Sequence, residues 1–499
     1  MKLLLVFLNN EYRTFVPPNL SSLGGYVRRH GHEVKVFDTS FYSDVVNIGN
    51  IERNIKAGTY VGVDYSSIGV EHKKGTSDEA ILDFIADYKP DLIGFSVYGY
   101  TVHIANKISK AVKKVYKDIP IIYGGIEVTL HPDKYIEKSY VDMICNGEGE
   151  KALLEVCNRI AFGRDFTGIE NIWVKENNEV KKSPIGQFMD MDDLVGYDWD
   201  PYEPYQHYSP FNGKLQKMAI VEFSRGCPYS CTFCESTTLK ILHSDIGIKK
   251  YTRQKSPEKF VDECAHLVEK YGVEMFYFCD GTFLVMPDKV LRILAPLFKE
   301  KVNKPFFCLT TVPSVTEERA QLLKDMGCIQ VNMGIESGDE QYRSEVLGRP
   351  NMTNEKIVNA FKIMRNVDIT TSSYNMIGMP WQNRSGVFET IELNRLAKPD
   401  WINVSIFIPF DGTLLLKKLQ DEGYVPEQLY IGDESQCTVP VPTDMSSDVI
   451  EALQRLFVLY CKVPKSLFPL LEKCETDKDL SSKVVHNLQK EYRNILYND

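Results

Sequence analysis

The sequence of 499 residues lacks any apolar run close to the roughly 20 residues that a membrane-spanning helix requires. The apolar start of the chain is short and ends in Asn9, Asn10 and Glu11, with no small-residue cleavage site after it, so it differs from a secretory signal. We therefore expect a cytoplasmic protein with no membrane span. In that reducing compartment its 12 cysteines are poor candidates for disulfides.

The sequence also lacks an excess of positive charge. Its 58 Lys and Arg residues are outnumbered by 68 Asp and Glu residues, the net charge is -10, and no basic patch stands out. A nucleic-acid partner is therefore not expected. The composition, 43% apolar and 25% charged, is that of a globular protein, and the length exceeds what one ordinary core needs, which predicts two or three domains.

Residues 1–160 alternate between short β-branched runs, such as 2–8 and 119–125, and amphipathic helical segments. This alternation predicts an α/β domain with a doubly wound, flavodoxin-like or Rossmann-like parallel sheet. Ligands bind such sheets at the carboxyl ends of the strands, where Gly124, Gly125 and Gly147 are expected. Glycines there either let a bulky ligand approach the backbone or simply turn the chain, and the pattern alone leaves both explanations open.

The rest of the chain divides into three parts. Residues 161–215 are rich in Asp, Tyr and Pro and are predicted to be a linker. Residues 216–425 contain about six strand–helix units, which predicts a full or partial (β/α) barrel whose functional groups lie where the strands end. Residues 426–499 are predicted to form a mainly helical C-terminal segment.

Three cysteines, Cys227, Cys231 and Cys234, lie in the spacing C-x3-C-x2-C directly after the first predicted strand of the barrel. A structural zinc site takes four protein ligands, and the nearest candidates for a fourth are His243 and, farther away, Cys264. Thiolates on a tight loop also suit an iron–sulfur cluster. A 4Fe–4S cluster held by three cysteines leaves one iron open to a substrate or a second cofactor.

This spacing, with Phe233 just before the third cysteine, closely resembles the motif of radical S-adenosylmethionine (SAM) enzymes. Residues 1–160 are in turn similar to the cobalamin-binding domain of one large branch of that family, through the segments 17–38, 90–101, 121–132 and 141–155. The similarity covers about residues 1–425. It implies three cofactors, namely a 4Fe–4S cluster on the three cysteines, SAM, and cobalamin.

The resemblance also implies roles for residues outside the cysteine motif. The expected cobalamin contacts are Gly99, Thr101, Gly124, Gly125, Gly147 and Glu148. The expected contacts to the other cofactors are Arg253, Asp280, Thr282, Glu336, Gly378 and Pro380. Each has an ordinary structural alternative, such as a solvated charge for Arg253, a turn cap for Asp280 or an ion-pair partner for Glu336.

Two features depart from the pattern of related sequences. The D-x-H-x-x-G signature, which supplies a histidine ligand to cobalt in other cobalamin proteins, is absent. His103 and His131 lie near predicted strand ends and are candidate replacements, although a lone histidine more commonly serves as a hydrogen-bonding residue. Asp411 stands where many relatives carry proline or another small residue, and the sequence assigns it no role.

The resemblance favours methylation of an unactivated carbon or phosphorus of a small metabolite, natural product, lipid or peptide. In this reaction one SAM methylates cobalt and another yields a 5′-deoxyadenosyl radical. An electron donor such as flavodoxin or ferredoxin would supply the electrons. The alternatives are a non-methylating oxidoreductase, cyclase or rearrangement enzyme, and a corrinoid- or redox-sensing protein without turnover. The substrate is expected where the first two domains meet.

Overall fold

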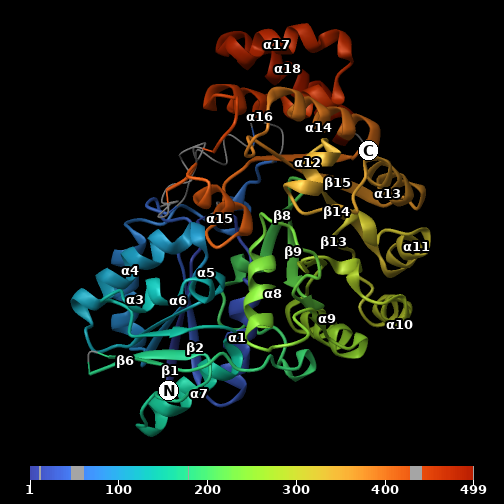
Figure 1. The fold of residues 1–499 in the computed structure, drawn as a ribbon. Coiled ribbons are helices and arrows are strands. Elements are labelled where there is room, and N and C mark those ends of the chain that lie inside the picture. The colour runs from blue at the N-terminus through green and yellow to red at the C-terminus, as the bar shows by residue number, and fades with distance from the viewer. Residues whose placement is uncertain (11–12, 46–54, 56–60, 178, 427–440, 498–499) are drawn as a thin grey trace.

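The computed structural model describes residues 1–10, 13–45, 55, 61–177, 179–426 and 441–497. Within these ranges two seven-stranded sheets lie side by side, each with its own helices, and a helical segment covers one end of the second sheet (Figure 1). The α/β architecture expected from the sequence is confirmed.

The first sheet has the strand order β2-β1-β3-β4-β5-β6-β7, and its first five strands pair in parallel. Its order 2-1-3-4-5 is that of a flavodoxin-like, doubly wound sheet. The central strands consist almost entirely of buried apolar residues, as strands covered on both faces must. The strands are β1 (Lys2–Phe7), β2 (Glu33–Asp38), β3 (Leu92–Ser96), β4 (Ile121–Gly124), β5 (Met143–Cys145), β6 (Ile172–Glu176) and β7 (Glu179–Lys182).

Helices cover both faces of this sheet because its strands present apolar side chains on both. One core joins the sheet to α3 and α4 through residues such as Ile81 and Ile108, and a separate core joins it to α1 and α7 through residues such as Leu20 and Val156. The helices of this half are α1 (Pro18–Arg29), α3 (Ser77–Tyr88), α4 (Val102–Val115), α5 (Ile126–Leu130), α6 (Pro132–Ile136) and α7 (Glu150–Phe162).

The stretch 161–215, expected as a linker, contains regular structure. Strands β6 and β7 form an antiparallel hairpin that extends the first sheet beyond β5, and β8 (Tyr208–Phe211) opens the second sheet. Between them, Tyr197 and Trp199 are buried in the core of the second sheet. The fourfold division of the chain into 1–160, 161–215, 216–425 and 426–499 stays a prediction.

The second sheet has the strand order β16-β15-β14-β13-β12-β9-β8, in which only β8 is antiparallel to its neighbour. It curls into part of a barrel, and in the described ranges no pairing joins β16 to β8, so the expectation of a full or partial barrel resolves to a partial one. The remaining strands are β9 (Lys214–Val221), β12 (Met275–Phe278), β13 (Phe306–Thr310), β14 (Cys328–Glu336), β15 (Thr370–Ile377) and β16 (Trp401–Ile406).

The helices between these strands cover the convex face of the partial barrel. Phe276 and Phe278 point into that helical layer, whereas Tyr277 between them packs with Phe307 on the other face of the sheet, because side chains alternate along a strand. The helices are α8 (Glu235–Asp245), α9 (Pro257–Tyr271), α10 (Asp288–Lys301), α11 (Glu317–Met326), α12 (Glu340–Glu345), α13 (Asn354–Asn366), α14 (Arg384–Ala397) and α15 (Leu414–Asp421).

The C-terminal segment is helical, as expected. It consists of α16 (Ser447–Lys462), α17 (Phe468–Thr476) and α18 (Lys478–Tyr497), while residues 427–440 of this segment lie outside the described ranges. Leu453 and Phe457 of α16 are fully buried against β16 and α14. No helix in the described part of the chain is long and apolar enough to cross a bilayer.

Gly125 connects β4 to α5, and its backbone angles, φ 102° and ψ 177°, belong to a region that only glycine adopts readily. A Cβ atom there would lie 2.6 Å from the carbonyl oxygen of Val97. We predict that Gly125→Ala lowers the free energy of unfolding by about 2–5 kcal/mol, measured by urea denaturation. Gly31→Ala is the matched control, since Gly31 also has a positive φ of 90° but open space around a Cβ. Equal losses in the two variants would show that the close approach of β3 and β4 is unimportant.

Candidate functional site

A cavity of about 660 Å³ lies between the carboxyl ends of the first sheet and the partial barrel. In a sheet of order 2-1-3-4-5 the ligand crevice opens between β1 and β3, where consecutive connections run to opposite faces. Asn9 and Asn10 after β1 and Ser96 and Tyr98 at the end of β3 line the cavity at this position. The far wall comes from the barrel and includes Ile220, Glu222, Arg225, Gly226 and Cys279.

Four of the six residues predicted to contact cobalamin line this cavity, namely Gly124, Gly125, Gly147 and Glu148. Gly147 has a φ of 122°, and its N–H donates to Oγ1 of Thr129, so its conformation is fixed before any ligand binds. A Cβ at Gly125 would lie 2.6 Å from Val97, and one at Gly147 would lie 3.2 Å from Asn171, so both glycines allow the strand ends to pack closely at the wall of the cavity.

The other two residues, Gly99 and Thr101, do not line the cavity. They belong to the short 3₁₀ helix η2 (Gly99–Thr101), where the buried hydroxyl of Thr101 bonds the backbone of Tyr98 in both directions. This turn presents Tyr98 and Tyr100 to the cavity with their rings stacked at 5.7 Å. Burial raises the pKa of Tyr98 to about 12, so its hydroxyl stays protonated.

Neither histidine considered as a cobalt ligand lines the cavity. His131 instead lies 3.3 Å from Asp411, in a contact between α5 and the loop after β16. His103 is in the first turn of α4. Their assignment as cobalt ligands therefore gains no support from the cavity.

The three cysteines lie on one loop beside the cavity, which Gly226 lines directly before Cys227. Gly226 has a φ of 84°, and a Cβ there would lie 2.4 Å from the carbonyl oxygen of Tyr251. The loop is held from its other side by Lys240, whose ammonium donates to the carbonyl oxygens of Pro228 and Tyr229. Contacts with Tyr251 and Lys240 therefore hold the backbone of this loop in place.

The thiols of Cys227, Cys231 and Cys234 are half-buried and close enough to influence one another. Burial raises the pKa of all three, and neighbouring thiols add to the increase at Cys231 and Cys234, so that the pKa of Cys234 reaches about 11. Arg349 opposes this effect at Cys227 and Cys231. Thiolates bind iron, so assembly of a cluster here would release protons from these groups. Three thiols on one loop are soft donors of the kind that binds an iron–sulfur cluster.

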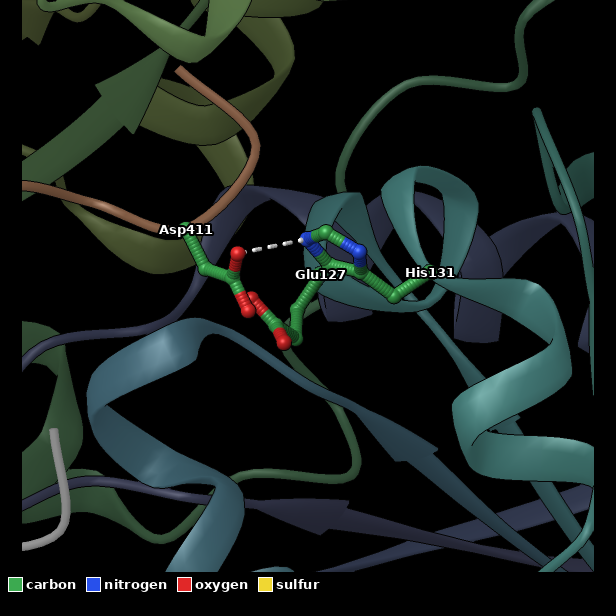
Figure 2. A group of neighbouring side chains, drawn as sticks. All are labelled: Glu127, His131 and Asp411. Atoms are coloured by element: carbon green, nitrogen blue, oxygen red, sulfur yellow. Dashed lines mark ion pairs between the residues drawn. The ribbon is translucent and has the colours of Figure 1, made fainter. Parts of the chain in front are cut away.

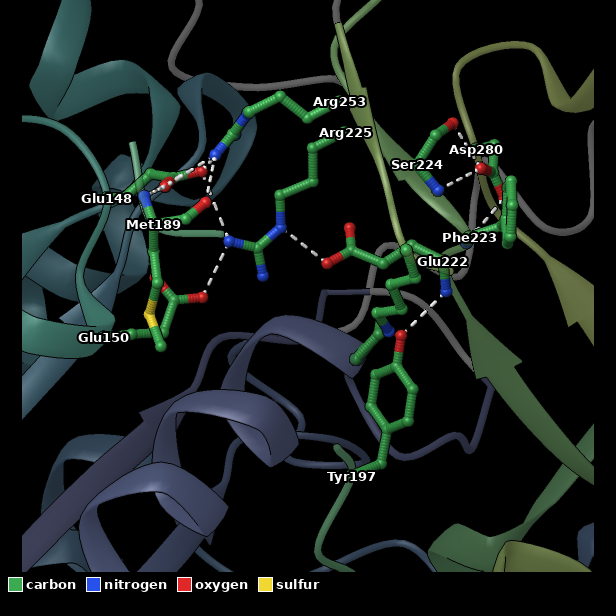
Figure 3. Close-up of polar contacts among 12 residues, drawn as sticks. Glu148, Glu150, Met189, Tyr197, Glu222, Phe223, Ser224, Arg225, Arg253 and Asp280 are labelled. Carbon is green, nitrogen blue, oxygen red and sulfur yellow. Dashed lines mark hydrogen bonds and ion pairs between the residues drawn. The ribbon is translucent and has the colours of Figure 1, made fainter. Parts of the chain in front are cut away.

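A partly buried network of charges ties the cysteine segment to the first sheet (Figure 3). Arg225, two residues before Cys227, bonds Glu222 at 2.6 Å and reaches across to Glu150 at 2.8 Å and Glu148 at 3.3 Å. Arg253 holds both oxygens of Glu148, at 2.5 and 3.1 Å. Burial opposes the charge on Arg225, but Glu222, Glu150 and Glu148 outweigh it and raise its pKa.

Arg253 and Glu148, predicted to contact different cofactors, thus contact each other. Burial would raise the pKa of Glu148, but the hydrogen bond from Arg253 and the charge of Arg225 outweigh it and lower the pKa. Both side chains still line the cavity, so each stays a predicted cofactor contact. The Arg253 guanidinium also stacks over the ring of Phe188 at 3.9 Å, which fixes its plane.

Asp280 and Thr282 follow β12 and are both almost fully buried. The carboxylate of Asp280 accepts hydrogen bonds from the backbone N–H groups of Phe223 and Ser224 and from the Ser224 hydroxyl (Figure 3). Burial raises the pKa of Asp280 to about 6, although these hydrogen bonds lower it. Asp280 therefore fixes the backbone that leads into the cysteine loop.

The remaining predicted residues lie at the ends of β14 and β15. Glu336 has a backbone φ of 64°, and its carboxylate pairs with Arg349 at 2.8 Å. Gly378 has a φ of 70° and donates its N–H to Gln382, and the carbonyl oxygen of Pro380 accepts from the hydroxyl of Tyr342. All of them lie on the carboxyl side of the barrel strands, as the barrel prediction required, and their cofactor contacts stay predictions.

Sequence reasoning missed Arg225, Glu150 and Glu222, which form most of the interdomain network, and Cys279, which lines the cavity. Glu150 lies two residues after Glu148, and Arg225 lies two residues before Cys227, so proximity to these predicted site residues was the available signal. Nothing in the sequence indicates that Arg225 and Glu150 meet, because 75 positions of chain separate them and their contact depends on how the domains dock.

Two family models match the chain in the order that the sequence suggested. The B12 binding domain matches residues 6–157, and the Radical SAM superfamily matches residues 221–394. The first domain implies cobalamin, and the second implies SAM and a 4Fe–4S cluster, so the three cofactors expected from the sequence are confirmed at the level of the family.

Two curated relatives differ in their named activities. An uncharacterized methyltransferase of Pyrococcus horikoshii is 26% identical over 340 residues, which cover 67% of this chain and 70% of that protein. The anaerobic magnesium-protoporphyrin IX monomethyl ester cyclase of Rubrivivax gelatinosus is 25% identical over 376 residues, which cover 74% of this chain but only 65% of the cyclase.

Among solved structures, the chain is similar to TsrM of Kitasatospora setae, a radical S-adenosylmethionine methyltransferase with cobalamin and a [4Fe-4S] cluster bound. The TM-score is 0.62 at 19% identity, and the alignment covers 88% of this chain and 83% of TsrM. At this identity the likeness shows the fold, and it extends across both sheets.

We predict that Glu148→Gln lowers the free energy of unfolding by about 1.5–3 kcal/mol at pH 7, because two partly buried arginines, Arg225 and Arg253, lose a charged partner. The pKa of Glu148 is lowered in the folded state, so its contribution is present above the unfolded pKa near 4.5 and is lost as pH falls through the folded value. Urea denaturation from pH 7 to pH 3.5 should therefore show the difference from wild type shrinking. Glu155→Gln, on the exposed side of α7, is the control and should change little. A difference that stays constant with pH would contradict this role.

Proposed function

Because this chain belongs to the cobalamin-dependent radical SAM enzymes, we propose that it methylates an unactivated carbon, or a phosphorus, of a small metabolite, natural product, lipid or peptide. When bound, the cofactors supply a methyl group carried on cobalt and a 5′-deoxyadenosyl radical that removes hydrogen from the substrate. The single observation that carries the proposal is the cavity shared by the carboxyl ends of the first sheet and the cysteine side of the barrel.

The residues of this chain have separable tasks in that reaction. Cys227, Cys231 and Cys234 would hold the cluster beside the cavity, and Gly124 and Gly125 line the part of the cavity where the corrinoid would lie. These groups bind, orient and exclude water, which is how proteins assist cofactors that carry out the difficult chemistry.

The charge network affects the reaction through the distance between the two cofactor sites. Arg225 connects the cysteine segment to Glu148 and Glu150 of the first sheet, so it sets the separation between the two cofactor sites. With the cofactors bound, a substrate in the cavity would have to lie within reach of both the cysteine side and the side formed by the first sheet. A fixed separation therefore favours the methyl-transfer geometry.

A second candidate function is non-methylating radical chemistry, such as oxidative cyclisation or a rearrangement. The similarity to a magnesium-protoporphyrin monomethyl ester cyclase specifically supports it. We prefer methyl transfer because, of these two relatives, the one aligned over the larger share of its own length is named a methyltransferase. Either reaction would take electrons from a donor such as flavodoxin or ferredoxin in the cytoplasm, and neither needs a nucleic-acid partner.

The test is anaerobic incubation of the reconstituted protein with SAM, hydroxocobalamin and a reductant, followed by chromatography with mass detection. We expect 5′-deoxyadenosine together with S-adenosylhomocysteine, the product left when SAM gives up its methyl group. Cys231→Ala should reduce 5′-deoxyadenosine to background, because one of three cluster ligands is lost. Cys264→Ala is the matched control, since it removes a buried thiol from α9, outside the cysteine loop, and should keep both products.

Two results would contradict the proposal. Formation of 5′-deoxyadenosine without any S-adenosylhomocysteine or methylated cobalamin would favour the cyclase-like reaction. Absence of both products from a protein whose cluster is fully assembled would instead support a binding protein that senses the corrinoid or the redox state.

A further inference from the structure

Asp411, to which the sequence assigns no role, meets two side chains of the first domain (Figure 2). Glu127 and His131 lie four residues apart on α5 and at its end, so they project from the same side of that helix. Asp411 comes from the loop that follows β16 in the barrel. One ligand atom from each of the three residues lies within 4.8 Å of the other two. The cluster therefore joins the two domains at a place outside the cofactor cavity.

Two buried atoms of this cluster have no hydrogen-bond partner among the described residues. Glu127 is only 2% exposed, and its Oε2 is unpartnered, while its Oε1 accepts from the hydroxyl of Tyr135 at 2.6 Å. Nε2 of His131 lies 3.3 Å from Oδ1 of Asp411, but without the geometry of a hydrogen bond. Buried polar atoms are rarely left unpaired, so this arrangement indicates a missing partner.

One partner that accepts electron pairs would satisfy both of these atoms at once. An imidazole nitrogen and two carboxylate oxygens form a donor set that suits divalent first-row ions such as Mn²⁺, Fe²⁺ or Zn²⁺. Around an ion with bonds of about 2.1 Å, ligand atoms lie roughly 3–4 Å apart, so small side-chain rotations would bring these three into place. The hydroxyl of Tyr135 on Glu127 is the kind of second contact that orients a ligating carboxylate.

Lys134 now supplies the positive charge beside the two carboxylates. Its Nζ lies 3.3 Å from Oε1 of Glu127 and 3.1 Å from Oδ2 of Asp411. The side chain is 46% exposed and ends a flexible stem, so it can turn toward solvent when another cation enters. It makes no contact that would satisfy Oε2 of Glu127 or Nε2 of His131.

The loop that carries Asp411 is also tied to the cysteine segment. The N–H of Gly412 donates to Oδ1 of Asp411 at 3.0 Å, and the carbonyl oxygen of Gly412 accepts from Thr238 of α8 at 2.7 Å. Helix α8 begins directly after Cys234. An ion bound by Asp411 would therefore connect the first domain, the last barrel strand and the helix that follows the cysteine loop.

We propose that Glu127, His131 and Asp411 bind one divalent transition-metal ion that clamps the first domain to the barrel. The ion plays no part in electron or group transfer, and its binding is independent of which reaction the cavity supports. Failure of the methyltransferase proposal would therefore leave this site untouched, and the reverse also holds.

Mn²⁺ is the probe, because it prefers oxygen and nitrogen donors to thiolates and its electron paramagnetic resonance (EPR) signal weakens on binding. Full-length protein with its cluster assembled and oxidised is titrated with Mn²⁺ alone. We expect one bound ion per chain, with Asp411→Asn and His131→Gln each weakening binding at least ~10-fold. Asp133→Asn, an exposed carboxylate on the neighbouring helix α6, is the matched control and should bind as wild type does.

Circular dichroism establishes whether each variant folds. If either Asp411→Asn or His131→Gln fails to fold, the other still tests the site. The proposal is overturned if wild type binds no Mn²⁺ in the micromolar to millimolar range, or if binding survives both ligand substitutions. Lys134→Met distinguishes the remaining explanation. If Lys134 is the permanent cation, only this variant will bind Mn²⁺; if it yields to the metal, the variant will bind more tightly than wild type.

Discussion

A partly buried positive charge at Arg225 sets how the two halves of this protein face each other. Removing a guanidinium from water costs several kcal/mol, which only well-placed carboxylates offset. Three are present, and two of them, Glu148 and Glu150, belong to the first domain. If the barrel moved away from the first sheet, Arg225 would lose two of its three carboxylate partners. Because Arg225 lies two residues before Cys227, the same contact fixes where the cysteine loop stands relative to the neighbouring strand ends.

The incomplete closure of the barrel follows from this arrangement. A closed barrel would direct its strand ends to an isolated mouth, whereas here the described strands run from β8 to β16 without a joining pair. The concave side is left for the first domain to cover, and both sheets then contribute walls to one cavity. Helices shield the opposite face with a continuous apolar core that includes Phe276, Phe278 and Phe298. The partial barrel thus relies on its neighbour for cover on the side where chemistry is expected.

The sequence was sufficient to predict the features that depend on residues close together along the chain. The parallel sheets were predicted from alternating strand and helix patterns, and the cysteine motif from its spacing. Contacts between distant segments were out of reach. The sequence predicts a cofactor contact for Glu148 and another for Arg253, whereas the structure shows the two side chains bonded to one another. This contact could not be predicted, because no local sequence pattern indicates which loops meet. The hairpin of β6 and β7 was also missed, since short polar strands at a sheet edge, such as Glu179–Lys182, have weak periodicity and resemble a linker.

Asp411 shows why a departure from a family pattern becomes interpretable only in three dimensions. In sequence it is an acidic residue in a loop, with no neighbour that explains it. In the fold it faces Glu127, and two carboxylates at such a distance repel each other unless a cation lies with them. Lys134 meets part of that need, yet it leaves one buried oxygen of Glu127 and one buried nitrogen of His131 without a partner. A lysine that only neutralised the cluster would have no need of a histidine beside it. The presence of both is the reason to regard the cluster as a site for an exchangeable cation and not as a fixed ion pair.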